Sequence, residues 1–151
     1  MRAYFSRRYR LSASHRLHSN GLSAEENQAI YGKCNNPHGH GHNYVIEVTV
    51  GGQVAAETGM VCNLVDLDEC VKREVVGRFD HANLNFDPLF QERVPTTENL
   101  CMEVYRLLKA AFDEAEVVRV RIEETSNNFF EYPVDGRRAR QGREQTWQNR
   151  Q

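Results

Sequence analysis

Residues 42–50, HNYVIEVTV, carry the clearest secondary-structure signal in the chain. Five of these nine residues are β-branched and a sixth is tyrosine, a composition that favours a strand. Upstream, residues 4–14 show partial alternation of apolar and polar side chains, with arginines interleaved, which predicts another strand. We expect these two strands to pair antiparallel.

Downstream of 42–50, the apolar residues change from strand to helical spacing. Residues 64–79 have apolar side chains on one helical face, with Asn63 available as N-cap, and residues 97–112 repeat this pattern after Thr96 and Thr97. Two further strands, 117–124 and 128–134, flank a short hairpin connection. This order predicts an α+β domain, in which two helices cover one face of a four-stranded antiparallel sheet.

Between the first two strands lies a long segment rich in Gly, Asn and Pro. It includes one short helix candidate, 23–31, where Ser23 and Glu26 form a capping-box pattern. The rest is predicted to be loop, and a loop of this length in a small domain is usually functional or disordered.

Length and composition restrict the class of protein. The 151 residues fit one domain, predicted over 1–135, followed by a polar tail at 136–151 with five arginines against one glutamate. The net charge of -2 argues against nucleic acid or membrane as the main partner, and the basic tail alone leaves nucleic-acid binding a weak alternative. No apolar run is long enough to span a bilayer, and the four cysteines form no CxxC pair. We therefore expect a cytoplasmic protein.

Three histidines are placed to share a metal ion. His40 and His42 lie two apart at the start of a strand, so both imidazoles point to one side. His15 ends the strand expected to pair with it. Three neutral imidazoles suit zinc and leave a position open for substrate. HxH pairs also occur by chance, however, and His18 and His38 are interpreted as spectators.

Other candidate residues have both a functional and a structural interpretation. Cys34 would be a fourth ligand, a general base or a plain buried thiol. Asp80 next to His81 could relay protons. Glu124 could be a surface carboxylate, while Thr96, Thr97 and Glu98 could merely begin a helix.

Taken in order, several segments resemble the 6-pyruvoyl-tetrahydropterin synthase family. These segments span almost everything from Phe5 to Tyr132: FSRRYRLSASHRL, GKCNNPHGHGHNY, TGMVCNLVDL, FDHANLN, PTTENL and EETSNN. The resemblance implies the tunnelling fold, whose subunits trimerise into a barrel and stack as a homohexamer.

The resemblance also implies roles for individual residues. His15, His40 and His42 fall on the zinc ligands, and Cys34 on the catalytic cysteine. Asp80 and His81 fall on a catalytic pair that a neighbouring subunit contributes. The remaining matches, in the pterin pocket, are Glu124, Thr96, Thr97 and, by its place in the motif, Glu98.

The implied activity is a carbon-oxygen lyase that eliminates triphosphate from 7,8-dihydroneopterin triphosphate without an external reductant. Basic residues must then hold the triphosphate, with Arg7, Arg8, Arg10, Arg16 and Lys33 as candidates. Two alternatives stay open: 6-carboxy-tetrahydropterin synthase of queuosine biosynthesis, and a zinc- or pterin-binding protein without catalysis. The C-x5-HGH spacing from Cys34 to His40 resembles the pyruvoyl type.

Overall fold

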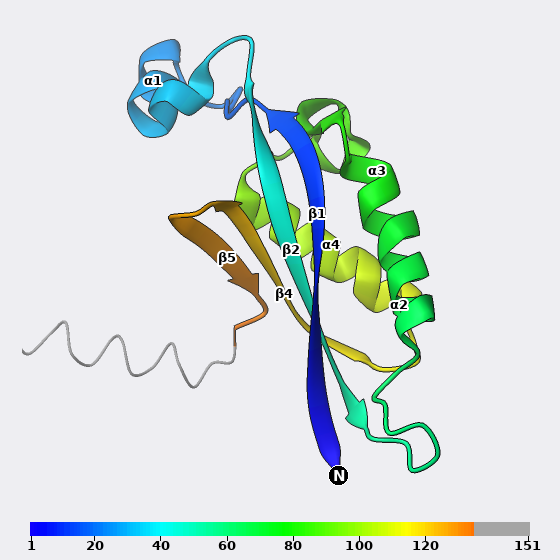
Figure 1. Cartoon of the computed structure of the whole chain (residues 1–151). Coiled ribbons are helices and arrows are strands. Elements are labelled where there is room, and N and C mark those ends of the chain that lie inside the picture. Colours follow the sequence, from blue (N-terminus) through cyan, green and yellow to red (C-terminus); the bar gives the residue numbers. More distant parts are fainter. Residues whose placement is uncertain (135–151) are drawn as a thin grey trace, which may run out of the picture.

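A twisted five-stranded sheet forms the centre of the protein, in a computed structural model that describes residues 1–134 (Figure 1). The order across the sheet is β3-β1-β2-β4-β5. The strands are β1 (Arg2–His15), β2 (His40–Gln53), β3 (Ala82–Asn83), β4 (Glu116–Thr125) and β5 (Asn128–Tyr132), and the α-helices are α1 (Ala24–Tyr31), α2 (Leu64–Val71), α3 (Gly77–Phe79) and α4 (Thr97–Ala111). Helices α2, α3 and α4 lie against one face, which confirms the predicted α+β class. The predicted tail at 136–151 lies outside the described residues.

Strands β1 and β2 pair antiparallel along their whole length. The register runs from Arg2 opposite Gln53 to His15 opposite His40. Side chains alternate between the two faces of the sheet, so Leu11 on β1 and Tyr44 and Ile46 on β2 are buried beneath the helices. This register therefore decides which side chains reach the helical face.

The predicted helix over 64–79 is a continuous helical run in three parts. Helix α2 passes through a π-helical turn (Lys72–Val76) into α3, and the apolar face, including Val71 and Phe79, is buried. The Asn63 side chain accepts a hydrogen bond from the Val65 amide over 3.0 Å, so the predicted cap is confirmed.

The other predicted helix caps also form. Thr96 caps α4 by accepting from the Asn99 amide over 3.2 Å. Ser23 and Glu26 make the reciprocal capping box of α1. Helix α4 buries its apolar face, with Leu100, Val104 and Leu108, against the sheet. Because Thr96 caps α4, Thr97 is the first residue of the helix, where its side chain contacts Glu124 on β4.

Two details differ from the sequence expectation. The sheet has a fifth strand, β3, which pairs parallel to β1 with Ala82 opposite Ala13, so the prediction of four antiparallel strands was wrong on this point. A strand of two residues contains no periodicity that a sequence could reveal. The second detail is a pair of short 3-10 turns, Leu84–Phe86 and Pro88–Phe90, between the two long helical segments.

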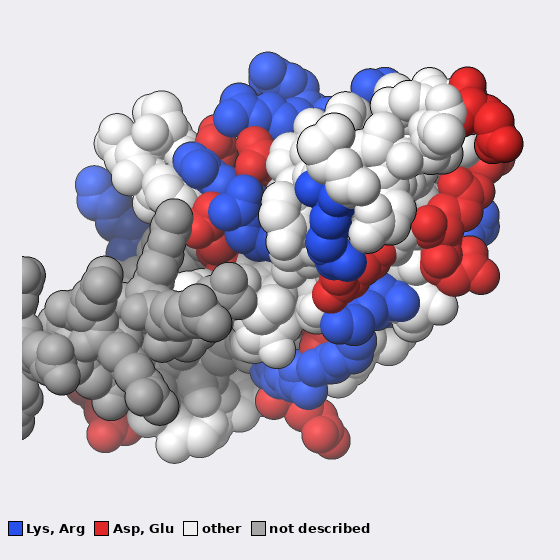
Figure 2. All heavy atoms as spheres, turned by 90° about the horizontal axis from the view of Figure 1, so that it is seen from below, with Lys and Arg blue, Asp and Glu red and all other residues white. Residues whose placement is uncertain are grey.

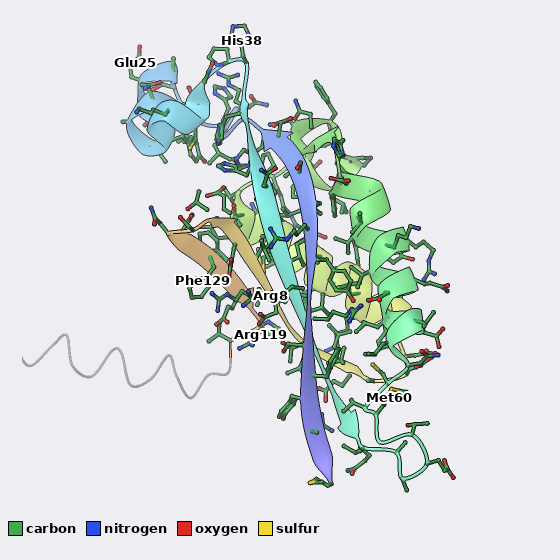
Figure 3. The ribbon with its side chains drawn as sticks, viewed as in Figure 1. Arg8, Glu25, His38, Met60, Arg119 and Phe129 are labelled. Carbon is green, nitrogen blue, oxygen red and sulfur yellow. The ribbon has the colours of Figure 1, made fainter. Side chains whose placement is uncertain are left out.

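The face of the sheet that is turned away from the helices is charged. Arg8 contacts Glu47, and Arg119 lies within ion-pair distance of both Glu47 and Glu131. Figure 3 shows Arg8 and Arg119 on this face, with Phe129 close by on β5. Seen along the sheet from below, basic and acidic side chains lie interleaved (Figure 2). Across residues 1–134, none of the helices has the length and apolar character needed to cross a bilayer.

Candidate functional site

Three imidazoles meet at the end of the sheet, on its helical face. The β1–β2 register places His15 opposite His40, and His42 follows two residues later on the same side. Ala13 lies opposite His42 in the same register. Nε2 of His15 lies 3.1 Å from Nε2 of His40, and one ligand atom from each of the three histidines lies within 4.8 Å of the others.

The chemistry of this cluster fits a metal ion. Nδ1 of buried His15 lies 2.7 Å from the Pro95 carbonyl oxygen, so Nδ1 carries the proton and Nε2 is free to bind a metal. Nε2 of His42 is buried and has no hydrogen-bond partner among the described residues. Burial lowers the pKa of both His15 and His42, which favours the neutral imidazoles that metals require. The cluster can therefore hold a metal ion.

Glu124, near the end of β4, lies directly beside these histidines. Its Oε1 accepts a hydrogen bond from the Thr97 hydroxyl over 2.7 Å, and its Oε2 accepts one from the side-chain amide of Asn128 over 2.9 Å. Nε2 of His42 is 3.5 Å away and Nε2 of His15 is 3.7 Å away. Burial raises the pKa of Glu124, but the two hydrogen bonds and the two histidines together lower it below its usual value. The carboxylate is thus held ionised and oriented.

Cys34 approaches the site from the loop between β1 and β2. It lies half-buried in a 3-10 turn (Gly32–Asn35), and its carbonyl accepts a hydrogen bond from the Leu17 amide over 2.8 Å. The side chain of Asn35 also donates to the Leu17 carbonyl over 2.8 Å. These bonds tie the turn to the chain that leaves His15. Cys34 is not part of the three-histidine cluster.

The segment Thr96, Thr97 and Glu98 splits into three different environments. Thr96 is used as the helix cap, Thr97 is buried against Glu124, and Glu98 is exposed. Only Thr97 of the three has its side chain in direct contact with the residues around the histidines.

Asp80 and His81 lie at the edge of β1 and are not members of the three-histidine cluster. The Asp80 carboxylate accepts from the Ser12 amide over 2.8 Å, and the His81 amide donates to the Ser12 carbonyl. His81 has a φ of 57°, an uncommon conformation for a residue other than glycine. It borders a pocket that Ser12, Ser14 and Asn43 line together with His42 of the three-histidine cluster. Nδ1 of the exposed His81 is 3.0 Å from Asp80.

The five basic candidates are not equally free to hold a phosphate. Arg7 makes a bidentate ion pair with Asp68, and Arg8 contacts Glu47. Arg10 and Lys33 are exposed. Arg16 lines a polar cavity of about 460 Å³, which Arg93 and Pro95 also line. Within residues 1–134, Pro95, whose carbonyl contacts His15, links this cavity to the histidine site.

Comparison with known proteins decides the family. The profile described as 6-pyruvoyl tetrahydropterin synthase matches residues 4–134, nearly the whole of the described chain. This chain belongs to the 6-pyruvoyl tetrahydropterin synthase family. The predicted family is thereby confirmed, as is the expectation of an enzyme of this carbon-oxygen lyase type.

Individual members of the 6-pyruvoyl tetrahydropterin synthase family are similar over most of their length. The 6-pyruvoyl tetrahydrobiopterin synthase of Poecilia reticulata is 47% identical over 130 residues, which are 85% of this chain and 88% of the relative. The structure of the Caenorhabditis elegans 6-pyruvoyl tetrahydropterin synthase superposes with a TM-score of 0.85 at 39% identity, covering 89% of this chain and 97% of that one, and confirms the tunnelling fold. A putative 6-carboxy-5,6,7,8-tetrahydropterin synthase of Archaeoglobus fulgidus is 37% identical over 75% of this chain and 90% of its own.

Sequence reasoning missed three groups that shape this site in the 6-pyruvoyl tetrahydropterin synthase family member. Asn128 holds Glu124, the Pro95 carbonyl orients His15, and Tyr44 lies behind His42. The period of two from His42 could have indicated Tyr44, since strand residues two apart share a face. Nothing in the sequence marks a backbone carbonyl such as that of Pro95.

Proposed function

We propose that this protein is a zinc-dependent 6-pyruvoyl-tetrahydropterin synthase that acts on 7,8-dihydroneopterin triphosphate. It would eliminate triphosphate and rearrange the side chain internally, as part of tetrahydrobiopterin-type biosynthesis. One observation carries the proposal: three histidines that suit a metal and an ionised, oriented carboxylate lie together on one buried face. Family membership gives this arrangement its chemistry.

His15, His40 and His42 would hold the zinc ion, with the proton on Nδ1 of His15 fixed by Pro95. When bound, zinc supplies a Lewis acid that stabilises negative charge developing on the substrate side chain. Cys34 is proposed as the base that removes a carbon-bound proton rather than as a fourth ligand. Its place outside the three-histidine cluster supports this role.

Glu124 is proposed to anchor the pterin. An ionised carboxylate can accept two hydrogen bonds side by side, which matches the adjacent amino and ring N–H groups of a pterin. Thr97 already orients one of its oxygens. Thr96 and Glu98, at the same helix start, would line the rim of the pocket.

A second subunit would complete the site. Asp80 and His81 are not members of the cluster of His15, His40 and His42, although His81 borders a pocket that His42 also lines. Within residues 1–134, the outer edge of β1 is paired only at Ala13 and Ser14, which leaves most of this long strand open. Open strand edges recruit further strands. We therefore propose a homohexamer built from two trimeric barrels, in which Asp80 and His81 act on a neighbour's substrate.

The main alternative is a 6-carboxy-tetrahydropterin synthase, which would use the same substrate in queuosine biosynthesis. Two observations favour the pyruvoyl product: the C-x5-HGH spacing, and the higher identity to a relative named for that product than to the 6-carboxy relative. A non-catalytic zinc- or pterin-binding protein is less favoured, because Cys34, Asp80 and His81 are all present. Neither nucleic acid nor membrane is proposed as a partner, and the four free cysteines suit the reducing cytoplasm.

The decisive experiment is to incubate the zinc-loaded protein with 7,8-dihydroneopterin triphosphate and identify the product by mass spectrometry. We expect inorganic triphosphate and 6-pyruvoyl-tetrahydropterin in equal amounts. A 6-carboxy product would transfer the protein to the alternative activity. Tight zinc or pterin binding without triphosphate release would leave only the binding function.

A further inference from the structure

Tyr44 contains a buried hydroxyl that has no hydrogen-bond partner within residues 1–134. The residue is 0% exposed, and its OH contacts no donor or acceptor at hydrogen-bond distance among the described residues. A tyrosine hydroxyl normally finds a partner when it is buried, because an unsatisfied buried polar group costs stability. Such an exception calls for a physical explanation.

The surroundings of Tyr44 are those of the active site. It follows His42 by two residues on the same face of β2, and its ring centroid is 5.5 Å from that of His42 and 6.4 Å from that of His15. The adjacent pair in the β2–β4 ladder is Val45 opposite Glu123, which places Tyr44 across from Glu124. The phenol is thus next to the metal-binding face and beside the proposed pterin anchor.

The residues near the Tyr44 hydroxyl belong to the proposed pterin anchor. Thr97 is hydrogen-bonded to Glu124 over 2.7 Å, and Glu124 lies across from Tyr44 on the neighbouring strand. Thr97 and Glu124 are therefore close to the phenol, although neither is hydrogen-bonded to it. The Thr97 hydroxyl has only one hydrogen, which it donates to Glu124, so its oxygen retains room to accept another.

A completely buried side chain cannot touch the substrate without a rearrangement, so Tyr44 must act through a neighbour. We propose that Tyr44 is a positioning residue whose hydroxyl donates to Oγ1 of Thr97 when Glu124 holds a pterin, which completes a hydrogen-bond chain from Tyr44 through Thr97 to Glu124. This inference rests on the proposed function, since it assumes that Glu124 is the pterin anchor. This hydrogen-bond chain would polarise the Thr97 hydroxyl and strengthen its hydrogen bond to the Glu124 carboxylate.

The competing interpretation is that Tyr44 only fills the core. The two interpretations differ in the KM that they predict for Tyr44→Phe, a variant that keeps the ring and removes the unpartnered oxygen. In the ligand-free protein we expect the free energy of unfolding to stay unchanged or to rise, because no hydrogen bond is lost. We expect KM for 7,8-dihydroneopterin triphosphate to rise about three- to tenfold, with kcat nearly unchanged. A rise of this size corresponds to the loss of about one hydrogen bond that forms only when substrate is bound.

Tyr9→Phe provides a matched control. The Tyr9 hydroxyl is partnered, since it donates to Asp68 over 2.8 Å on the far part of β1, so this variant should lose stability and keep its KM. Thr97→Val tests whether Tyr44 acts through Thr97. If Tyr44 acts through Thr97, the double variant should raise KM no further than Thr97→Val alone. Additive effects of the two substitutions on KM would overturn the proposed hydrogen-bond chain. An unchanged KM in Tyr44→Phe would overturn it as well.

The dissociation constant, measured by titrating the protein with 7,8-dihydroneopterin triphosphate, separates this inference from the proposed function. A wild-type protein that binds the compound but does not release triphosphate would refute the proposed activity. The comparison of dissociation constants between wild type and Tyr44→Phe would still test Tyr44. A wild-type protein that neither binds nor converts the compound would overturn both.

Discussion

Nε2 of His42 lies 3.5 Å from Oε1 of Glu124. The residue that would bind the metal and the residue that would anchor the pterin are therefore neighbours on adjacent strands, β2 and β4. A substrate held by both groups has its ring and its reactive side chain fixed at the same time, which is the kind of positioning that lowers a reaction barrier.

Glu124→Gln should weaken substrate binding. The amide keeps the shape of the side chain and an oxygen for Thr97, but it loses the negative charge that attracts two N–H donors. Hydrogen bonds to a charged partner contribute about 1.5–3 kcal/mol, so we expect kcat/KM to fall at least tenfold, mainly through KM. The control is Glu123→Gln, the adjacent residue, whose carboxylate contacts Arg121 instead. Equal losses in both variants would show that Glu124 is not the anchor.

Replacing His15, His40 or His42 by alanine should each remove zinc. The metal content of purified protein, measured by elemental analysis, should fall from about one ion per chain towards zero, because two imidazoles hold zinc far more weakly than three. His38→Ala should retain the metal, since His38 is exposed at the turn before β2 (Figure 3). A variant with full zinc content would be excluded from the ligand set.

Cys34→Ala should keep zinc and abolish turnover. The thiol lies outside the three-histidine cluster, so its loss removes a base without opening the metal site. General-base catalysis commonly contributes 10²- to 10⁴-fold, and we expect a decrease in kcat of about this size. Cys62→Ala, at a buried position, is the matched control and should retain turnover. Loss of zinc from Cys34→Ala would instead make the thiol a ligand.

Mixing two inactive variants should restore activity if neighbouring subunits share each site. Cys34→Ala and His81→Ala chains, unfolded together and reassembled at equal amounts, should place both intact groups at about one quarter of the sites. Activity should recover towards that fraction of wild type. If Asp80 and His81 serve the histidines of their own chain, the mixture will remain as inactive as its components.

Asp87 should make the stability of the protein depend on pH. Hydrogen bonds from Arg78, at 2.8 Å, lower the pKa of the Asp87 carboxylate in the folded protein, an effect that burial partly opposes. A lowered folded-state pKa means that this stabilisation is present above the unfolded carboxyl pKa and is lost as pH falls through the folded value. Asp87→Asn should therefore lower the free energy of unfolding by about 1–3 kcal/mol at pH 7. Denaturant unfolding should show that the difference in unfolding free energy between wild type and Asp87→Asn becomes smaller below about pH 4. A difference that does not change with pH would contradict this prediction.

Periodicity in the sequence predicted the long helices and the four long strands. The apolar positions that end at Phe79 predicted the long helical run, and Asn63 predicted where it begins. Strand β3 was missed because two residues cannot show a pattern. The parallel pairing of Ala82 with Ala13 depends on where the helical run ends in space, which local sequence does not encode.

The site was only partly readable from the residues themselves. Alternation on β2 placed His40 and His42 on one face, but the position of His15 opposite His40 depends on a register that the long connection between the strands does not fix. The contact of Thr97 with Glu124 joins residues 27 positions apart, and only the family resemblance suggested both as pocket residues. The absence of a partner for the Tyr44 hydroxyl is a property of the packed chain and has no signature in sequence.

The Tyr44 hydroxyl also bears on how the protein would evolve in the laboratory. A library selected for heat resistance alone should accept phenylalanine at position 44, because that change removes an unsatisfied oxygen from the core. A library selected for growth at scarce substrate should retain tyrosine. The two selections would diverge at a residue that never meets solvent, and a thermostabilised descendant could carry a weakened enzyme with no visible change at its active-site surface.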